Sequence, residues 1–211
     1  MVANKKTGFI TLEGIDGSGK SSIVGMLASA LRKANVSVEL TQEPTKTWLG
    51  DAVRRGYKED ISPYSEAFLF LADRATHTDW IKKKIADGNL VISDRYSDST
   101  IAYQAALLHQ KLGGECAEYL DYLTGVSKQI ILEPDLTILF DVDPEISLKR
   151  LGNRTELEKF ETLENLRLVR QNYLDIAKDN DRICIIDSTA SLDTVRASTF
   201  EIIGKRLVVP L

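Results

Sequence analysis

The feature that most constrains this chain is an apolar strand pattern that runs directly into a glycine-rich motif. Residues 9–21 read FITLEGIDGSGKS, so that the spacing G-x-x-x-x-G-K-S falls on Gly14, Gly19, Lys20 and Ser21. Glycines let the backbone turn sharply and approach a polyphosphate closely, and the amides of such a loop and the following helix dipole face the phosphates. Apolar residues then recur at helical spacing from residue 23 to residue 34. The sequence therefore predicts a strand, loop and helix that bind a triphosphate.

Length and composition predict a single domain over residues 1–211. The chain is 43% hydrophobic and 27% charged, which is enough to bury one substantial core. Its formal net charge of −4 argues against sequence-independent binding to DNA or RNA. We find no signal peptide pattern and no apolar run that could span a membrane, so we expect a cytoplasmic protein without a membrane partner. Cys116 and Cys184 lack disulfide or metal-ligand patterning, and we expect two buried thiols of a reduced compartment.

Short apolar runs alternate with helical patterns along the chain, which predicts βαβ units and a five-stranded parallel sheet with helices on both faces. Ser62-Pro63 is typical of a helix start, and the long helix that follows is expected to end near Asp87-Gly88. Ligands of such sheets bind beyond the carboxyl ends of the strands, so we expect the residues that directly follow the strands to lie close together around a ligand. The predicted strands are 9–13, 36–40, 90–94, 136–142 and 183–187.

Charged residues at predicted strand and helix ends indicate phosphoryl transfer. Asp94 and Arg95 follow the third strand, which places a carboxylate where Mg²⁺ would need one and a guanidinium beside it. Further arginines at positions 74, 150 and 154 could bind phosphate oxygens bidentately. The segment around Gly152 is basic and weakly patterned, as expected of a flap that folds over phosphates.

No side chain stands out as a catalytic base. His77 and His109 lie inside predicted helices, where a packing or surface role is the ordinary one. A phosphate monoester needs no base because its oxygen is largely anionic at pH 7, whereas a hydroxyl acceptor would need a carboxylate such as Asp94. The sequence favours a phosphate acceptor mildly and leaves both open.

Several motifs together resemble the thymidylate kinase family over nearly the whole chain. The segment SDRYSDSTIAYQ is the specific one, since the glycine-rich loop alone would indicate only an NTPase. The resemblance implies a P-loop nucleotide kinase fold, with a phosphate loop at 14–21, an acceptor-binding region at about 42–104 and a short LID at about 150–161. The segments that carry it are 12–22 (LEGIDGSGKSS), 43–45 (EPT), 69–74 (LFLADR), 93–104 (SDRYSDSTIAYQ), 134–137 (PDLT) and 141–145 (DVDPE).

The resemblance implies transfer of the γ-phosphoryl group of ATP to dTMP, which gives dTDP and ADP for dTTP biosynthesis, by a homodimer that uses Mg²⁺. Lys20 and the loop amides would hold the ATP phosphates, and Arg150 would cover the adenine ring. Ser21 and Asp94 would bind Mg²⁺, Asp94 directly or through water. The donor site would comprise Gly14, Ile15, Asp16, Gly17, Ser18, Gly19, Lys20, Ser21, Ser22 and Arg150.

The resemblance also implies how thymine would be recognised. Phe70 and Arg74 lie four residues apart on one predicted helix and so project from the same face. In the family pattern the phenyl ring stacks on thymine and the arginine donates to a thymine carbonyl. Thr100 and Gln104 would approach the base from the next helix.

For the sugar and the phosphates the implied roles fall on four residues. Asp16 would accept the 3′-hydroxyl, and Tyr103 would exclude ribose because a 2′-hydroxyl would collide with it. Arg95 would bridge the two nucleotides, and Arg154 of the LID would meet charge that develops in the transition state. The catalytic residues would then be Lys20, Asp94, Arg95 and Arg154.

The chain departs from the family pattern in two places. Gly152 stands where relatives have another LID arginine, which leaves the number of acting LID cations open. Residues 42–46 read QEPTK where many relatives read Arg-Glu-Pro-Gly-Gly-Thr, so an arginine expected near the acceptor phosphate is missing. We expect Lys46 to supply this charge, or else Arg54 or Arg55 just beyond it.

Two other classes of protein use the same loop. A nucleoside kinase or another nucleotide kinase would share most of the motifs. A switch GTPase is disfavoured, because the guanine-reading Asn-Lys-x-Asp motif does not occur in the sequence. The acceptor that stimulates ADP formation distinguishes these classes.

Overall fold

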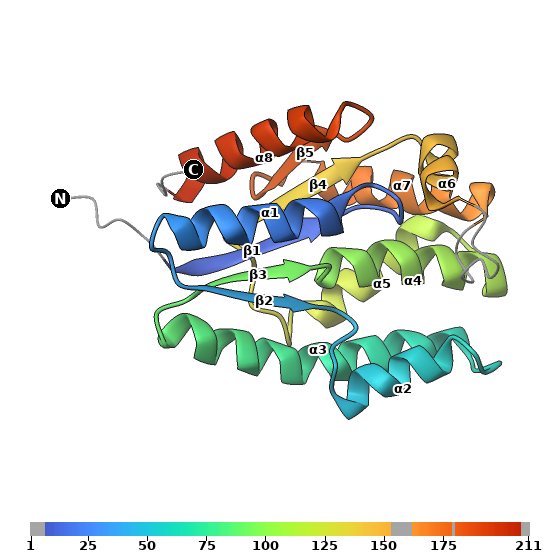
Figure 1. Cartoon of the computed structure of the whole chain (residues 1–211). Coiled ribbons are helices and arrows are strands. Elements are labelled where there is room, and N and C mark those ends of the chain that lie inside the picture. The colour runs from blue at the N-terminus through green and yellow to red at the C-terminus, as the bar shows by residue number, and fades with distance from the viewer. Residues whose placement is uncertain (1–6, 153–161, 179, 208–211) are drawn as a thin grey trace.

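The computed structural model describes residues 7–152, 162–178 and 180–207, and a five-stranded sheet forms its centre (Figure 1). The strands lie in the order β2-β3-β1-β4-β5, and every neighbouring pair is parallel. This confirms the predicted parallel α/β sheet. The strands are β1 (Gly8–Glu13), β2 (Val38–Gln42), β3 (Leu90–Asp94), β4 (Leu136–Asp141) and β5 (Ile183–Asp187).

The predicted position of the second strand was wrong by two residues. β2 pairs with β3 from Val38 opposite Leu90 to Gln42 opposite Asp94, whereas the apolar run predicted residues 36–40. β2 lies at the edge of the sheet and has a neighbouring strand on one side only, so polar residues can continue the ladder of hydrogen bonds. Pairing with β3 therefore sets the ends of this strand, and the apolar run does not.

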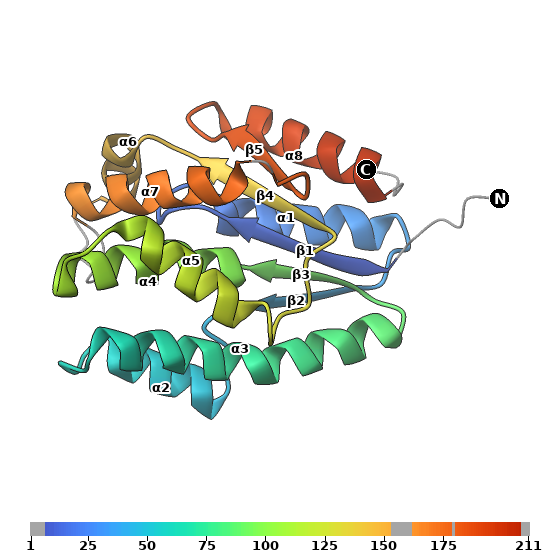
Figure 2. The same cartoon turned by 180° about the vertical axis from the view of Figure 1, so that it is seen from behind.

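Helices cover both faces of the sheet (Figures 1 and 2). α1 and α8 pack on one face, while α3, α4 and α7 pack on the other, with α5 outside α4. Since both faces are covered, every residue of β1 is buried, as is typical of the central strand of a parallel sheet. The helices are α1 (Lys20–Lys33), α2 (Trp48–Gly56), α3 (Pro63–Ala86), α4 (Ser97–Leu112), α5 (Cys116–Ser127), α6 (Pro144–Leu151), α7 (Leu163–Ala177) and α8 (Leu192–Leu207).

The long helix α3 begins and ends where the sequence predicted. Pro63 is its first residue, a position that leaves no backbone amide unsatisfied, and Asp87 follows its last turn. Gly88 then has a φ of 91°, which suits glycine and lets the chain turn into β3. Among the helices that the structure describes, α3 included, none combines the length and the apolar character that a membrane crossing requires.

The two cysteines are free thiols that are only partly buried, so the expectation of buried thiols was wrong in degree. Cys116 opens α5 and donates to Asn172 Oδ1 at 3.3 Å. Cys184 lies in β5, which is an edge strand and is covered incompletely. Both cysteines lie at the border of the core, which explains why they are only partly buried.

The carboxyl ends of the strands meet at one edge of the sheet, beside β1. β1 has β3 on one side and β4 on the other, so the chain changes direction across the sheet at this strand. In open α/β sheets ligands bind at such a switch point. The loops that follow β1, β2, β3 and β4 surround this crevice, which is where the sequence places its candidate residues.

Candidate active site

The loop between β1 and α1 lies against β4 and α6, and glycines make this approach possible. A Cβ atom added at Gly14 would lie 2.5 Å from the carbonyl oxygen of Phe140, and one at Gly17 would lie 2.6 Å from that of Ser147. Both glycines also have positive φ angles, 138° and 74°, which other residues rarely adopt. The predicted phosphate loop therefore has a tight shape that depends on its glycines.

Lys20 begins α1 and folds back over the loop. Its Nζ donates to the carbonyl oxygens of Gly14 and Ile15 at 2.8 and 3.0 Å, and to Ser18 Oγ at 3.2 Å. Burial lowers the pKa of Lys20 to about 8, and Arg95 contributes to the lowering. An anion in the loop would favour the charged ammonium and raise this pKa again.

Ser21 and Asp94 form the polar pair where a divalent cation could bind. Ser21 Oγ donates to Asp94 Oδ2 at 2.9 Å, which joins the start of α1 to the end of β3. Both oxygens are hard ligands of the kind that Mg²⁺ prefers, and Mg²⁺ usually takes its other ligands from phosphates and water. The described residues contain no cluster of three or more His, Cys, Asp or Glu that could hold a metal ion.

A hollow of about 510 Å³ extends from this pair along the phosphate loop, and we call it the outer hollow. Arg150 lies at its rim and donates to the carbonyl oxygen of Thr189 at 3.4 Å. Arg154 and most of the predicted LID at 150–161 lie outside the described residues. The outer hollow is lined by Asp16, Gly17, Gly19, Lys20, Ser21, Ser22, Gln42, Glu43, Asp94, Arg95, Arg150 and Leu151.

Asp16 in the loop is held by Arg95 and Tyr103. Arg95 NH2 donates to Asp16 Oδ1 at 2.6 Å, and the Tyr103 hydroxyl donates to Oδ2 at 3.0 Å. Burial alone would raise the pKa of Asp16, but the charges of Arg95 and Lys20 bring it down to about 2. These two cations explain how a carboxylate is tolerated inside a loop that is shaped for anions.

Beside the outer hollow lies a deeper cavity of about 230 Å³, which we call the inner pocket. Phe70 and Tyr57 form an apolar wall, with ring centroids 6.0 Å apart. The inner pocket brings together six of the residues predicted for the acceptor site, from four separate segments of the chain. Its lining is Asp16, Gln42, Glu43, Pro44, Arg54, Tyr57, Phe70, Arg95, Tyr96, Ser99, Thr100, Tyr103 and Gln104.

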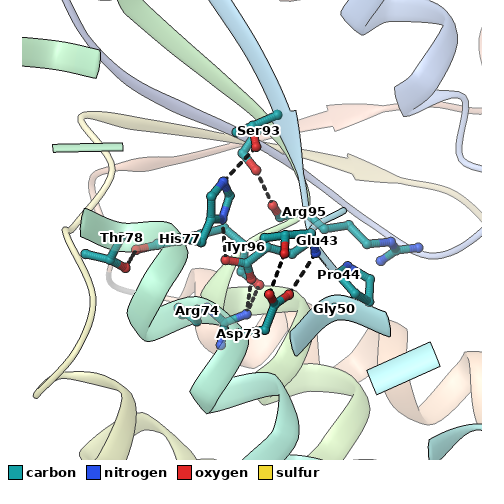
Figure 3. A network of polar contacts seen from close by, with 12 residues as sticks. Glu43, Pro44, Gly50, Asp73, Arg74, His77, Thr78, Ser93, Arg95 and Tyr96 are labelled. Carbon is teal, nitrogen blue, oxygen red and sulfur yellow. Dashed lines mark hydrogen bonds and ion pairs between the residues drawn. The ribbon is translucent and has the colours of Figure 1, made fainter. Parts of the chain in front are cut away.

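Arg74 lies beneath the inner pocket and is completely buried. Its NH2 donates to Glu43 Oε2 and to the carbonyl oxygen of Tyr96 at 3.0 Å (Figure 3). It also donates to Thr100 Oγ1 at 2.6 Å. Its Nε and NH1 have no partner among the described residues, and neither has the buried Oε1 of Gln104. Unpaired polar atoms in a dry site are costly, so this part of the pocket is suited to a ligand with hydrogen-bonding groups.

Glu43 and Asp73 fix the loop after β2, and the sequence assigned no role to either. Glu43 Oε1 pairs with His77 Nδ1 at 2.8 Å, while its other oxygen binds Arg74 (Figure 3). Asp73 accepts from Thr45 N at 2.7 Å and from Thr45 Oγ1 at 2.5 Å. His77 thus has the packing role expected of it. Glu43 and Asp73 both lie inside segments that resemble the family, 43–45 and 69–74, and this was their only signal in the sequence.

The structure separates the three cations that could replace the missing arginine. Lys46 lines a hollow of about 670 Å³ at the edge of the sheet, with Trp80, and is not among the residues that line the inner pocket. Arg55 is 78% exposed and pairs with Glu59. Arg54 lines the inner pocket and donates to the carbonyl oxygens of Pro44 and Thr45, at 3.2 and 2.6 Å. The geometry therefore favours Arg54 over Lys46, the first choice from the sequence.

Comparison with known proteins agrees with this geometry. The model of the family described as thymidylate kinase matches residues 12–199. A probable thymidylate kinase of Methanococcoides burtonii is 41% identical over 196 residues, covering 92% of this chain and 94% of the relative. One from Methanosarcina barkeri is 43% identical over 185 residues, with 86% and 88% covered, and one from Halorubrum lacusprofundi is 40% identical over 201 residues, with 94% and 98% covered. A match of this extent, on a chain with this loop and pocket, means that the protein belongs to the thymidylate kinase family.

Proposed function

We propose that this protein transfers the γ-phosphoryl group of ATP to dTMP and so makes dTDP and ADP for dTTP biosynthesis. The observation that carries the choice of acceptor is the unpaired Oε1 of Gln104, which lines the inner pocket. Arg74 lies behind the lining, where its NH2 donates to Thr100 Oγ1 at 2.6 Å. Thymine presents the complementary group, because its N3–H donates.

The orientation of the Gln104 amide follows from its other partner. Its Nε2 donates to Glu66 Oε1 at 3.2 Å, and a carboxylate oxygen can only accept, so Oε1 is the atom left for a ligand. Cytosine would turn its N3 acceptor toward Gln104 Oε1, and this contact would be repulsive. The pocket should therefore reject dCMP and accept dTMP.

For the sugar, we propose that Asp16 accepts the 3′-hydroxyl and that Tyr103 excludes ribose. Support comes from the place of both side chains between the inner pocket and the phosphate loop, with the Tyr103 hydroxyl 3.0 Å from Asp16. Phe70 would stack on the base from the apolar wall, with Thr100 at its edge.

For the reaction, we propose that Lys20 and the loop amides hold the donor phosphates and that Arg95 bridges the two nucleotides. Arg95 lines both the outer hollow and the inner pocket, so its guanidinium lies where the two phosphate chains would meet. Bridging lowers the repulsion between two anions that must approach in line. Arg150 and Arg154 would approach the donor from the LID side.

Mg²⁺ fits the pair of Ser21 and Asp94, and when bound it would neutralise charge on the donor phosphates. The two side chains are already joined at 2.9 Å at the mouth of the phosphate loop. Asp94 would hold the metal directly or through water. A phosphate acceptor then leaves no need for Asp94 to act as a base.

For the acceptor phosphate, we propose that Arg54 supplies the missing charge. Replacing Arg54 by methionine should raise the KM for dTMP by about 10- to 100-fold, the range of a lost charge-assisted hydrogen bond. The matched variants Lys46→Met and Arg55→Met should leave this KM within about twofold, since a surface charge contributes little. Equal effects of all three substitutions would contradict the assignment.

The acceptor test is ADP formation with dTMP, dUMP, dCMP and thymidine supplied separately. We expect kcat/KM to be about 10³-fold or more higher for dTMP than for dCMP, because mismatched buried polar groups reject an analogue strongly. Gln104→Leu should reduce this ratio, while Gln110→Leu on an exposed part of the same helix should not. Equal use of dCMP would refute the base assignment, and stimulation by none of the four would refute the kinase proposal.

We also propose that two copies form a homodimer through α3 and α5 in the cytoplasm. Phe68 and Tyr122 are 48% and 42% exposed, and both contact the Tyr64 ring, so that an aromatic patch joins the two helices. Such patches commonly mark interfaces. Phe68→Asp should shift the mass measured by analytical ultracentrifugation from dimer to monomer. Free thiols at Cys116 and Cys184 support a reduced compartment.

A further inference from the structure

Arg95 has an unusual backbone as well as a central place in the site. Its φ is 69°, a left-handed conformation that costs energy for a residue with a side chain. Hydrogen bonds hold the peptide groups on both sides of it. Arg95 N donates to the carbonyl oxygen of Leu12 at 3.0 Å, its own carbonyl oxygen accepts from Ser93 at 2.6 Å (Figure 3), and the next amide, of Tyr96, donates to Glu13 Oε1 at 2.8 Å.

Glu13 also reaches the Arg95 side chain, through two hydroxyl groups. Ser99 Oγ and the Tyr173 hydroxyl both donate to Glu13 Oε2, the latter at 3.2 Å. The same two oxygens accept from Arg95 NH1, at 3.1 and 3.3 Å. Glu13 thus contacts the peptide group between Arg95 and Tyr96 directly, and it contacts the Arg95 guanidinium through the two hydroxyl groups.

The contacts with Glu13 fix the direction in which the O–H bonds of Ser99 and Tyr173 point. Each hydroxyl has a single proton and can accept with its remaining lone pairs. When Ser99 donates to Glu13, and Tyr173 donates to Glu13 or to Ser99 at 2.7 Å, the lone pairs of both oxygens face Arg95. The negative charge of Glu13 therefore orders two acceptors of Arg95 NH1, while the carbonyl oxygen of Gly14, at 3.1 Å, is a further acceptor.

Glu13 has no surface through which it could touch a nucleotide. It is 0% exposed and is absent from the residues that line the inner pocket and the outer hollow. Asp98 lies close enough to disfavour its charge, but Asp98 is itself paired with Arg182 at 2.7 Å. Any effect of Glu13 on the reaction must then pass through its neighbours.

We propose that Glu13 is a positioning residue for phosphoryl transfer, which acts through Ser99 and Tyr173 to hold the Arg95 guanidinium between the two nucleotides. The inference rests on the proposed role of Arg95 in the kinase reaction. It also links α7, which follows the LID in the sequence, to the phosphate-bridging arginine through Tyr173.

The test is a double-mutant cycle of Glu13→Gln and Arg95→Met, with kcat/KM for dTMP as the readout. A glutamine amide would donate to the hydroxyls where the carboxylate accepts, and so turn their protons toward Arg95. We expect Glu13→Gln to lower kcat/KM by about 10- to 100-fold, as misplaced catalytic groups do. In the Arg95→Met background the same change should cost less than about threefold, because coupled residues are not additive.

A structural role alone would give the same loss in both backgrounds and would overturn the inference. Glu39→Gln, a matched change on β2, should retain full activity. If Glu13→Gln does not fold, Tyr173→Phe and Ser99→Ala remove the hydroxyls singly, and each should lower kcat/KM by about 3- to 10-fold only while Arg95 is present.

A crystal structure of Glu13→Gln tests the inference without any activity. Arg95 NH1 should lose its contacts with Ser99 and Tyr173, and an unchanged Arg95 would overturn the proposal. Absence of dTDP formation by the unmodified protein would instead refute the proposed function, so that the two failures can be told apart.

Discussion

Glu13 should make the protein less stable as the pH rises, and Glu13→Gln should remove this dependence. Burial, with a further contribution from Asp98, raises the pKa of Glu13 from 4.5 to about 7 in the folded protein. Between these two values the folded state binds more protons than the unfolded state, so the free energy of unfolding falls with increasing pH. At 1.36 kcal/mol for each tenfold change in proton affinity, the loss is about 3 kcal/mol between pH 4.5 and 8.

Thermal unfolding of the unmodified protein and of Glu13→Gln at several pH values measures this effect. A glutamine does not titrate, and all other ionisable groups are shared, so the difference in Tm between the two proteins isolates Glu13. In a chain of this size 1 kcal/mol corresponds to about 2–4 °C, so the Tm difference should change in favour of Glu13→Gln by about 6–12 °C from pH 4.5 to 8. A difference that stays constant over this range would refute the reasoning.

Three further predictions concern the loop and the acceptor. Gly14→Ala should destabilise the fold by about 1–3 kcal/mol, since its Cβ would meet the Phe140 carbonyl at a φ of 138°, whereas Gly25→Ala in open space on α1 should stabilise it by about 0.5–1 kcal/mol in chemical denaturation. Asp16→Ala should make kcat/KM for dTMP and for its 3′-deoxy analogue similar, while the unmodified protein should prefer dTMP by about 10-fold or more, the contribution of a hydrogen bond to a charged group; equal rates in the unmodified protein would contradict the contact. Turnover should fall as the dTMP phosphate is protonated below its second pKa of about 6, and a pH profile flat down to about pH 5 would contradict an anionic acceptor.

The sheet and the phosphate loop could be predicted because their determinants are local. The loop motif fixes glycines within six residues of one another, and four of the five apolar runs coincide with strands to within about one residue. β2 could not be placed in the same way, because its ends follow from pairing with β3. Local pattern specifies the element, while partners elsewhere in the chain specify its limits.

The cation proposed for the acceptor phosphate could not be chosen from the sequence. Lys46 is nearest to the missing arginine along the chain, yet it lies in the hollow at the sheet edge, while Arg54 lines the inner pocket. Asp73 of α3 holds Thr45, the residue before Lys46, a contact that no spacing rule predicts. The role of Glu13 could not be predicted for the same reason, since its partners Tyr96 and Tyr173 are 83 and 160 residues away in the sequence.

A buried carboxylate with a raised pKa lowers stability as the pH rises, and a role in the reaction can offset this cost. An uncharged residue of the same shape at position 13 would gain stability relative to the unmodified protein as the pH rises. What the charge adds is order among hydroxyl protons next to Arg95, whose own backbone is strained. Strain and desolvated charge both concentrate at this one arginine, as expected where stability is given up for the geometry of a reaction. A variant that gains stability relative to the unmodified protein as the pH rises, and that is at the same time slower, would therefore be the joint signature of Glu13, and neither measurement alone distinguishes it from an ordinary core residue.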